Sequence, residues 1–412
     1  MRKIMTFILI VVLLSFTVHE AKAQSSPPNI YTDGVVLMDA ATGEILYSKN
    51  MDTQYPPAST TKIMTALLTL ENANLDDVVT VGKNPPLIDG SKIYLFEDEK
   101  LTVKDLLYAL LLRSANDAAL TLAEHISGSS EEFAKLMNKR ALELGCSNTN
   151  FVNPSGLYDD MHRTTARDLA LIMKELIKHE EYIKISTTSM YYIQPTNKSK
   201  EKRPLWNENR LIQKSSNYYY EGCEAGKTGY TIQSKHSYVA VASRNGIKLI
   251  AVLLHDSNKA YWSDARKLFD YGFENFSKAT LYSKGDMVGE YTIKEGLNIP
   301  LLAAENFYYL KNKDSTETPK LKINSKDLSK TSFNRWQNIL TAEVFYNNKS
   351  IGSLNLASGA DYAYKAPALA LKNSVNSINS MKILAYPVIL ILLISLLRIR
   401  KKVKQKKRDR YW

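Results

Sequence analysis

The sequence predicts an α/β fold. An antiparallel sheet is flanked by helices and carries a helical subdomain, and a small all-β domain and a C-terminal membrane helix follow it. Three observations predict this architecture. Strand-like runs occur near both ends of residues 24–276, helix-like periodicity fills the stretch between them, and an apolar segment lies close to the end of the 412-residue chain. A chain of this length holds two or three domains and buries a sizeable core.

The strand-like runs of the first domain come in two groups that lie far apart in the chain. The first group flanks a turn at residues 40–43, and the second flanks Asn245-Gly246, a strong signal for a two-residue hairpin turn. We therefore expect strands from both ends of this domain to share one sheet. The β-prone runs are 35–39, 44–47, 238–242 and 248–254.

Between these groups, apolar residues recur at three- and four-residue spacing, which predicts helices that pack on the sheet. Thr102 and Asp105 have the spacing of a helix N-cap. The predicted helical segments are 59–71, 102–113, 117–127, 131–144 and 166–178.

The character of the sequence changes after Phe276. Short strand-like runs separated by polar loops fill residues 277–365, and no helical period is sustained there, so we expect a small all-β domain. Residues 366–381 are rich in Ser, Asn and Lys and are interpreted as a linker.

The N-terminus has the pattern of a signal peptide, residues 1–23. Two basic residues precede an apolar run from Ile4 to Val18, and Ala21-Lys22-Ala23 supplies the small residues of a cleavage site. The run is short for a membrane span, which needs about 20 residues, so cleavage is favoured over an uncleaved anchor.

The C-terminal apolar segment is interpreted as a transmembrane helix, residues 382–398. Lys382 and Arg398 flank the apolar run and have side chains long enough to reach the interfaces. The basic tail, residues 399–412, is expected in the cytoplasm, which places the preceding domains outside the cell membrane. The alternative, a helix lying in the interface, is disfavoured because the run has no polar face.

The net charge of +12 is concentrated at the two ends of the chain. Residues 398–412 contribute +8 and residues 1–23 contribute +2, which leaves only +2 for everything between them. A nearly neutral central region does not favour nucleic-acid binding. Cys146 and Cys223 are far apart in sequence, so two inert thiols are favoured over a disulfide.

Several common chemistries have no signature in the sequence. G-x-S-x-G, H-E-x-x-H, Gly-rich phosphate loops and paired C-x-x-C are missing, and the histidines do not cluster at metal-ligand spacing. We therefore expect neither a metal nor a cofactor.

Ser59-Thr60-Thr61-Lys62 is the first candidate motif. Pro56 and Pro57 precede it and an amphipathic run follows, so Ser59 is expected at a helix N-terminus with Lys62 one turn away on the same face. A neutral lysine there can take the hydroxyl proton. Spacing alone is weak evidence, because Ser199-Lys200-Glu201-Lys202 has the same pattern without the helix.

Two further motifs follow in the chain. Ser114-Ala115-Asn116 falls between two predicted helices, where a loop can project it into a cleft, although by itself it is equally typical of a helix end. Lys227-Thr228-Gly229 opens the second group of strands. On an edge strand its lysine can bind a carboxylate, and its glycine allows a substrate backbone to approach closely.

The order S-x-x-K, S-x-N, K-T-G resembles the penicillin-recognising serine enzymes. It is most similar to the low-molecular-weight penicillin-binding proteins that are D-alanyl-D-alanine carboxypeptidases. Three further stretches, 55–58, 153–157 and 268–273, resemble the same family, and the resemblance covers about residues 28–365. It implies a penicillin-binding transpeptidase-like or β-lactamase-like catalytic domain over residues 24–276.

The resemblance also implies roles for the motif residues. Ser59 is then the nucleophile, Lys62 its general base, and Ser114 relays a proton to the leaving D-alanine nitrogen. Asn116 orients Lys62 and the substrate amide. The substrate carboxylate is expected at Lys227 and Thr228, and the oxyanion at the backbone N–H groups of Ser59 and Tyr230.

The partners that the family implies are peptidoglycan stem peptides ending in D-Ala-D-Ala, and β-lactam antibiotics. The chain departs from the family at Ser234-Lys235-His236, where relatives have a small residue and Gly, and at Lys259, the candidate to replace a substrate-binding arginine. A D,D-endopeptidase, a β-lactamase and a non-catalytic wall-binding relative remain alternatives.

Overall fold

The computed structural model describes residues 27–365, 389–403 and 405. The chain divides into two compact units. Among the described residues, one comprises 27–289, 301–325 and 338–357, and the other comprises 290–300, 326–337 and the described residues after 357. The domain boundaries expected from the sequence stay predictions.

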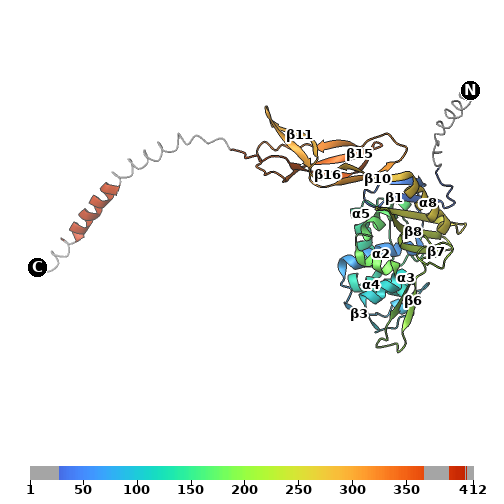
Figure 1. Ribbon diagram of the computed structural model, residues 1–412. Helices are drawn as coiled ribbons and strands as arrows, with labels where there is room; N and C mark the ends of the chain where they lie inside the picture. Colours follow the sequence, from blue (N-terminus) through green and yellow to red (C-terminus); the bar gives the residue numbers. More distant parts are fainter. Residues whose placement is uncertain (1–26, 366–388, 404, 406–412) are drawn as a thin grey trace, which may run out of the picture. The chain divides into compact units, whose positions relative to one another are not determined.

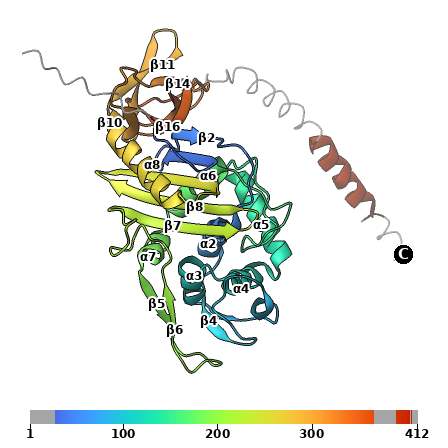
Figure 2. The ribbon, with the colours of Figure 1, turned by 90° about the vertical axis from the view of Figure 1, so that its right-hand side faces the viewer.

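A five-stranded antiparallel sheet forms the centre of the first unit (Figures 1 and 2). Its strand order is β2-β1-β9-β8-β7, so the N-terminal hairpin joins the C-terminal strands through the β1–β9 pair, as the sequence predicts. β7 lies at the free edge of the sheet. The bounds are β1 Gly34–Asp39, β2 Ile45–Lys49, β7 Cys223–Thr231, β8 Lys235–Arg244 and β9 Ile247–Asp256.

The predicted hairpin turn at Asn245-Gly246 is present between β8 and β9. Both residues have positive φ, 52° and 75°, as a two-residue turn that matches the strand twist requires.

The helices of this unit either pack on one of the two faces of this sheet or contact other helices and the short strands among them. They are η1 Ala58–Thr61, α2 Lys62–Asn72, η2 Pro85–Leu87, α3 Val103–Leu112, α4 Asn116–Ser127, α5 Ser130–Glu143, α6 Ala166–Leu176, α7 Glu180–Thr187 and α8 Tyr261–Asn275. The five predicted helical segments are confirmed, with a capping box at Thr102 and Asp105. The sequence patterns did not predict α7 and α8 as helices, because α7 is short and the buried face of α8 mixes aromatic residues with Gly272.

Alternate residues of β1 face two separate cores. Val36 and Met38 pack with α2 and α6, while Val35 and Leu37 pack with α8 on the opposite face. Burying one such aliphatic side chain stabilises the fold by roughly 1.5–3 kcal/mol. Eight consecutive residues of α2, from Lys62 to Thr69, are buried, so packing on all sides holds this helix in place.

Two short pairs of antiparallel strands that the sequence patterns did not predict lie among the helices. β3 (Val78–Thr80) pairs with β4 (Lys100–Thr102), and β5 (Met190–Ile193) pairs with β6 (Arg203–Trp206). Strands of three or four residues carry too little alternation to be recognised by pattern.

Residues 277–365 contain strands and loops and no helix, which confirms the predicted all-β character. β10 (Phe276–Tyr282) pairs with β13 (Phe307–Asn312). A five-stranded sheet has the order β11-β12-β16-β15-β14, with bounds Met287–Lys294, Leu297–Ala303, Lys349–Ser358, Asn338–Tyr346 and Lys320–Asn324 in that order.

The predicted signal peptide and linker lie outside the described residues. Residues 389–403 are helical and include part of the predicted transmembrane segment. Within the described part of the chain, no helix combines the length and the apolar character that crossing a membrane requires. The membrane helix therefore stays a prediction.

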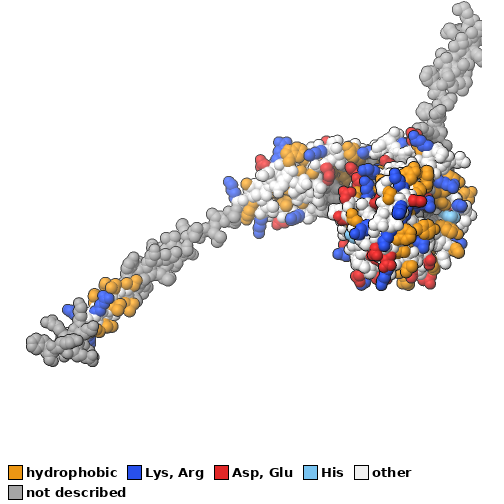
Figure 3. Space-filling model, turned by 90° about the horizontal axis from the view of Figure 1, so that it is seen from below, with side chains coloured by type: hydrophobic (Ala, Val, Ile, Leu, Met, Phe, Trp, Pro, Cys, Tyr) orange, Lys and Arg blue, Asp and Glu red, His pale blue; other side chains and the backbone are white. Residues whose placement is uncertain are grey.

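Both cysteines are free thiols, as expected, and burial raises the pKa of each above its usual range. The face in Figure 3 shows Lys and Arg side chains interspersed with Asp and Glu, without a large basic field.

Candidate active site

Ser59 lies in a short 3-10 turn that runs directly into α2. The sequence predicted a helix N-terminus here; the structure refines this, because α2 itself begins at Lys62. Ala58 has a φ of 51°, which is unfavourable for a residue with a Cβ and is found preferentially at functional sites. The Thr60 hydroxyl donates to the Pro57 carbonyl at 2.7 Å and closes the turn.

Lys62 is fully buried and its side-chain nitrogen contacts three oxygens. The distances from Nζ are 3.0 Å to Ser59 Oγ, 2.7 Å to Asn116 Oδ1 and 2.6 Å to the Ser155 carbonyl. Two of these oxygens only accept hydrogen bonds, so they take the two N–H groups of a neutral amine. The lone pair of that amine then faces the Ser59 hydroxyl, which is the geometry that removes its proton.

The electrostatic surroundings favour this neutral form. Burial is the main reason that the pKa of Lys62 lies well below its usual value, and repulsion by Lys227 lowers it further. Attraction by Asp117 and Glu208 opposes the shift.

The Ser155 carbonyl is presented by a tight turn over residues 153–157. The Asn153 side chain accepts hydrogen bonds from the backbone N–H groups of Ser155 and Gly156. Gly156 has a φ of 82°, and a Cβ there would lie 1.8 Å from the Ala58 carbonyl oxygen. Only glycine lets this turn pack against the nucleophile turn, which explains a stretch that the sequence marked by resemblance alone.

Ser114 and Asn116 link α3 to α4, as the sequence predicts. Ser114 has a φ of 56°, a strained conformation that ends α3 and directs the chain into the cleft. The Asn116 amide donates from Nδ2 to the Asp89 carbonyl at 2.7 Å, and its Oδ1 accepts from Lys62.

The K-T-G residues lie on the edge strand β7. The Lys227 side chain is almost fully buried, and its Nζ donates to the Thr228 carbonyl at 2.8 Å. Burial lowers the pKa of Lys227 to about 8, while attraction by Glu208 opposes the shift. A Cβ on Gly229 would lie 2.9 Å from the Ser59 backbone nitrogen. The glycine therefore allows close packing of β7 on the nucleophile turn, beyond the substrate approach that we inferred from sequence.

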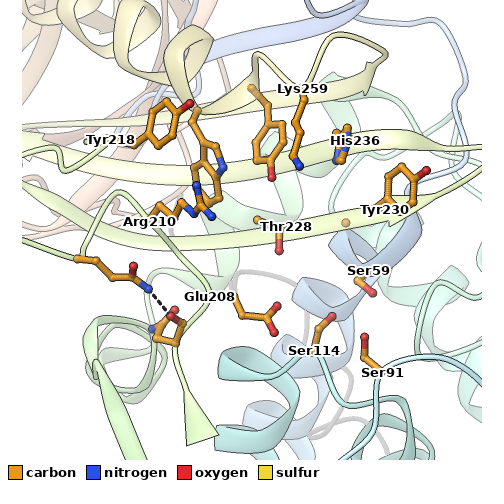
Figure 4. Close-up of a pocket in the computed structure, with 15 residues that line it drawn as sticks. Ser59, Ser91, Ser114, Glu208, Arg210, Tyr218, Thr228, Tyr230, His236 and Lys259 are labelled. Atoms are coloured by element: carbon orange, nitrogen blue, oxygen red, sulfur yellow. Dashed lines mark hydrogen bonds between the residues drawn. The ribbon is translucent and has the colours of Figure 1, made fainter. Parts of the chain in front are cut away.

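One cavity of about 710 Å³ joins these motifs (Figure 4). Figure 4 shows Ser59, Ser91 and Ser114 on the helical side of β7, and Lys259 and His236 across that strand. Tyr230 is 58% exposed and its ring packs on His236 with centroids 4.6 Å apart. The full lining is Ser59, Ser91, Ser114, Asn207, Glu208, Arg210, Gln213, Tyr218, Thr228, Gly229, Tyr230, His236, Lys259, Tyr261 and Trp262.

The structure thus brings all eight predicted site residues to one region. The sequence motifs did not predict the roles of Ser91, Glu208, Arg210 and the Ser155 carbonyl. None of these groups belongs to the S-x-x-K, S-x-N or K-T-G motif. Glu208 is the unexpected group, a half-exposed carboxylate that lines the cavity and pairs with Arg113 at 3.2 Å.

Comparison with known proteins identifies the same architecture. The family model described as D-alanyl-D-alanine carboxypeptidase matches residues 20–258, and the one described as penicillin-binding protein 5, C-terminal domain, matches residues 276–364. The D-alanyl-D-alanine carboxypeptidase DacF of Bacillus subtilis is 37% identical over 284 residues, 68% of each chain. DacC of Escherichia coli is 34% identical over 65% of this chain and 68% of its own length.

Solved structures agree with these matches. Penicillin binding protein 5 from Haemophilus influenzae superimposes with a TM-score of 0.67 at 30% identity, covering 82% of this chain and 99% of that one. Since a family model covers more than half of the sequence and each of the three motifs contributes a residue to one cavity, the chain belongs to the D-alanyl-D-alanine carboxypeptidase family, the low-molecular-weight penicillin-binding proteins.

Proposed function

We propose that the protein is a serine-type D-Ala-D-Ala carboxypeptidase that trims peptidoglycan stem peptides and is acylated by β-lactams. The observation that carries the proposal is the position of the Lys62 amine. It is buried, its pKa is lowered, and it lies 3.0 Å from Ser59 Oγ. A hydroxyl so close to a neutral amine becomes a nucleophile at neutral pH.

The reaction proceeds in two steps on this geometry. Ser59 Oγ attacks the carbonyl carbon of the penultimate D-alanine while Lys62 Nζ takes the hydroxyl proton. The backbone N–H groups of Ser59 and Tyr230 stabilise the oxyanion. A proton relayed by Ser114 reaches the leaving nitrogen, the C–N bond breaks and D-alanine departs. Water then hydrolyses the ester and restores Ser59.

Two positively charged side chains support recognition of a terminal carboxylate. Lys227 lies beside Thr228, and Lys259 lines the same cavity from the loop before α8. The Glu208 carboxylate repels an anion in this region, so we propose that it limits the affinity of the cavity for the substrate carboxylate.

The test is D-alanine release from a stem peptide ending in D-Ala-D-Ala, together with fluorescent penicillin labelling of the full-length protein. We expect Ser59→Ala to abolish both, while Ser199→Ala, the control in the second S-x-x-K pattern, retains both. A labelled peptide that contains Ser199 would refute the assignment.

The same assays separate the alternatives. Rapid turnover of bound penicillin would indicate a β-lactamase, and release of monomers from a cross-linked stem-peptide dimer would indicate a D,D-endopeptidase. A protein that is not labelled by penicillin and does not release D-alanine would be a non-catalytic relative.

We also propose that the catalytic domain lies outside the cell membrane, after export by the N-terminal signal peptide and anchoring through residues 382–398. The support is the apolar run and the basic tail that follows it. Protease added to intact protoplasts should remove the ectodomain and spare a tag at Trp412. Loss of the tag would refute this topology.

A further inference from the structure

Asp117 is a buried carboxylate next to the active site, and the only effect described for it above is an attraction that raises the pKa of Lys62. It directly follows Asn116 in the first turn of α4 and is inaccessible to solvent. Burying a carboxylate is costly unless hydrogen bonds and charges compensate for lost water. The side chain therefore requires partners, and their identity shows what it holds in place.

The partners are backbone N–H groups of the loop that precedes β4. Ile93 N donates to Asp117 Oδ2 at 3.1 Å and Leu95 N donates to the same oxygen at 3.1 Å. Tyr94, between them, has a φ of 59°, so one left-handed residue allows both neighbours to point at one carboxylate. Oδ1 accepts from Ala118 N at 2.9 Å within α4. Asp117 thus fastens this loop to the start of α4.

The same loop also contacts Asn116 directly. The Asn116 backbone N–H donates to the Ser91 carbonyl at 2.7 Å, and its side-chain Nδ2 donates to the Asp89 carbonyl at 2.7 Å. Ser91 lines the catalytic cavity. The carbonyls that hold Asn116 therefore lie a few residues before the N–H groups that Asp117 holds.

The orientation of the Asn116 amide decides what Lys62 meets. With Nδ2 engaged by the Asp89 carbonyl, Oδ1 is directed at Lys62 Nζ, 2.7 Å away. If the loop moved away, the amide would lose this restraint and a flipped amide would present N–H donors to Lys62. Such a flip would take away one of the two acceptors that keep the lysine lone pair facing Ser59.

We propose that Asp117 is a positioning residue that fastens the loop of residues 89–95 to α4, so that its carbonyls orient Asn116 and, through it, Lys62. Asp117 does not touch the substrate or the reacting atoms. It acts through a chain of hydrogen bonds from the loop to Asn116 and from Asn116 to Lys62.

The test measures the acylation rate constant and the penicillin dissociation constant separately in the full-length protein. We expect Asp117→Asn to lower the acylation rate constant by about tenfold or more, because misplacing a catalytic group by about 1 Å costs up to a hundredfold. The dissociation constant should change by less than about twofold.

Asp168 supplies a matched control. It is also a buried aspartate in the first turn of a helix, α6, and accepts from Asn148 N at 3.0 Å and Thr149 Oγ1 at 2.7 Å. We expect Asp168→Asn to lower the melting temperature without changing the acylation rate constant at a temperature where the protein is folded. Equal losses of acylation in both variants would overturn the proposal, because Asp117 would then act through stability alone.

A double-mutant cycle tests the route through Asn116. In an Asn116→Ala background, Asp117→Asn should lower the acylation rate constant by less than about a further twofold, because the effects of residues that act through one another are not additive. A full tenfold loss in that background would overturn the route. If Asp117→Asn folds too poorly to assay, Asp117→Ser, whose hydroxyl still accepts one N–H, is measured with the same expected and overturning outcomes.

Discussion

Two segments of this chain have the same S-x-x-K spacing and entirely different surroundings. Ser59–Lys62 spans a 3-10 turn and the start of α2, with Lys62 fully buried against three oxygens. Ser199–Lys202 lies outside any helix or strand, its serine hydroxyl donates to the Glu201 carbonyl at 3.2 Å, and Lys202 is exposed.

The difference shows that spacing alone does not make a nucleophile. A lysine in water has a pKa near 10.4 and stays protonated at neutral pH. Removal from water and repulsion by Lys227 lower the pKa of Lys62. The following predictions test which features of the Ser59 surroundings matter.

The largest effect is expected from the lysine. Lys62→Arg supplies a positive charge but cannot give up its proton, so we expect a loss of acylation of at least about a hundredfold. Lys202→Arg, the same change in the second segment, should have no effect. Near-normal acylation by a folded Lys62→Arg protein, measured with fluorescent penicillin, would show that the lysine supplies only charge.

The next effect concerns the close packing of β7 on the Ser59 turn. A Cβ at position 229 would lie 2.9 Å from Ser59 N and 3.0 Å from the Pro57 carbonyl. We expect Gly229→Ala to separate the two oxyanion donors and to slow acylation about tenfold or more. Gly289→Ala, where the nearest atom is 3.9 Å from the added Cβ, is the control and should acylate normally.

The third prediction concerns pH. Acylation should rise with pH as Lys62 loses its proton, and the rise should lie well below the usual pKa of a lysine because burial lowers the pKa of Lys62. Acylation should fall above about pH 8, because Lys227, whose pKa is about 8, then loses the charge that attracts the substrate carboxylate. Acylation rate constants measured from pH 5 to 10 test both the rise and the fall. Lys227→Arg should remove the alkaline fall, and an unchanged fall in that variant would assign it to another group.

The smallest effect concerns stability and His162, which packs beneath the Ser59 turn. Val152 N donates to its Nδ1, so its Nε2–H donates to Thr61 Oγ1 at 2.9 Å. Burial lowers the pKa of His162 to about 4 from the usual 6.5, so the unfolded state binds more protons between these values. Stability should therefore decrease as pH falls from 6.5 to 4, by up to roughly 3 kcal/mol.

Denaturant unfolding at pH 7, 5 and 4 measures this dependence. His162→Gln should flatten it, whereas His125→Gln, at an exposed histidine, should leave it unchanged. If stability depends on pH equally in both variants, a group other than His162 is titrating.

Much of the fold follows from local patterns in the sequence. The five periodic segments became helices, and the Asn245-Gly246 turn became a hairpin, because periodicity and turn chemistry act over a few residues. The two short strand pairs and α8 were missed because their patterns are brief or interrupted by glycine and aromatic residues.

The sequence alone supplied the candidate reactive groups and their order along the chain: Ser59, Lys62, Ser114, Asn116 and the K-T-G residues. The protonation state of Lys62 depends on the folded chain, because its hydrogen-bond acceptors come from residues 54 and 93 positions away. The tertiary structure also decided that Glu208 lines the cleft and that Asp117 fastens the neighbouring loop. Spacing in sequence carries no information on such distant contacts, and burial, which sets the pKa of Lys62, arises only when distant segments pack together.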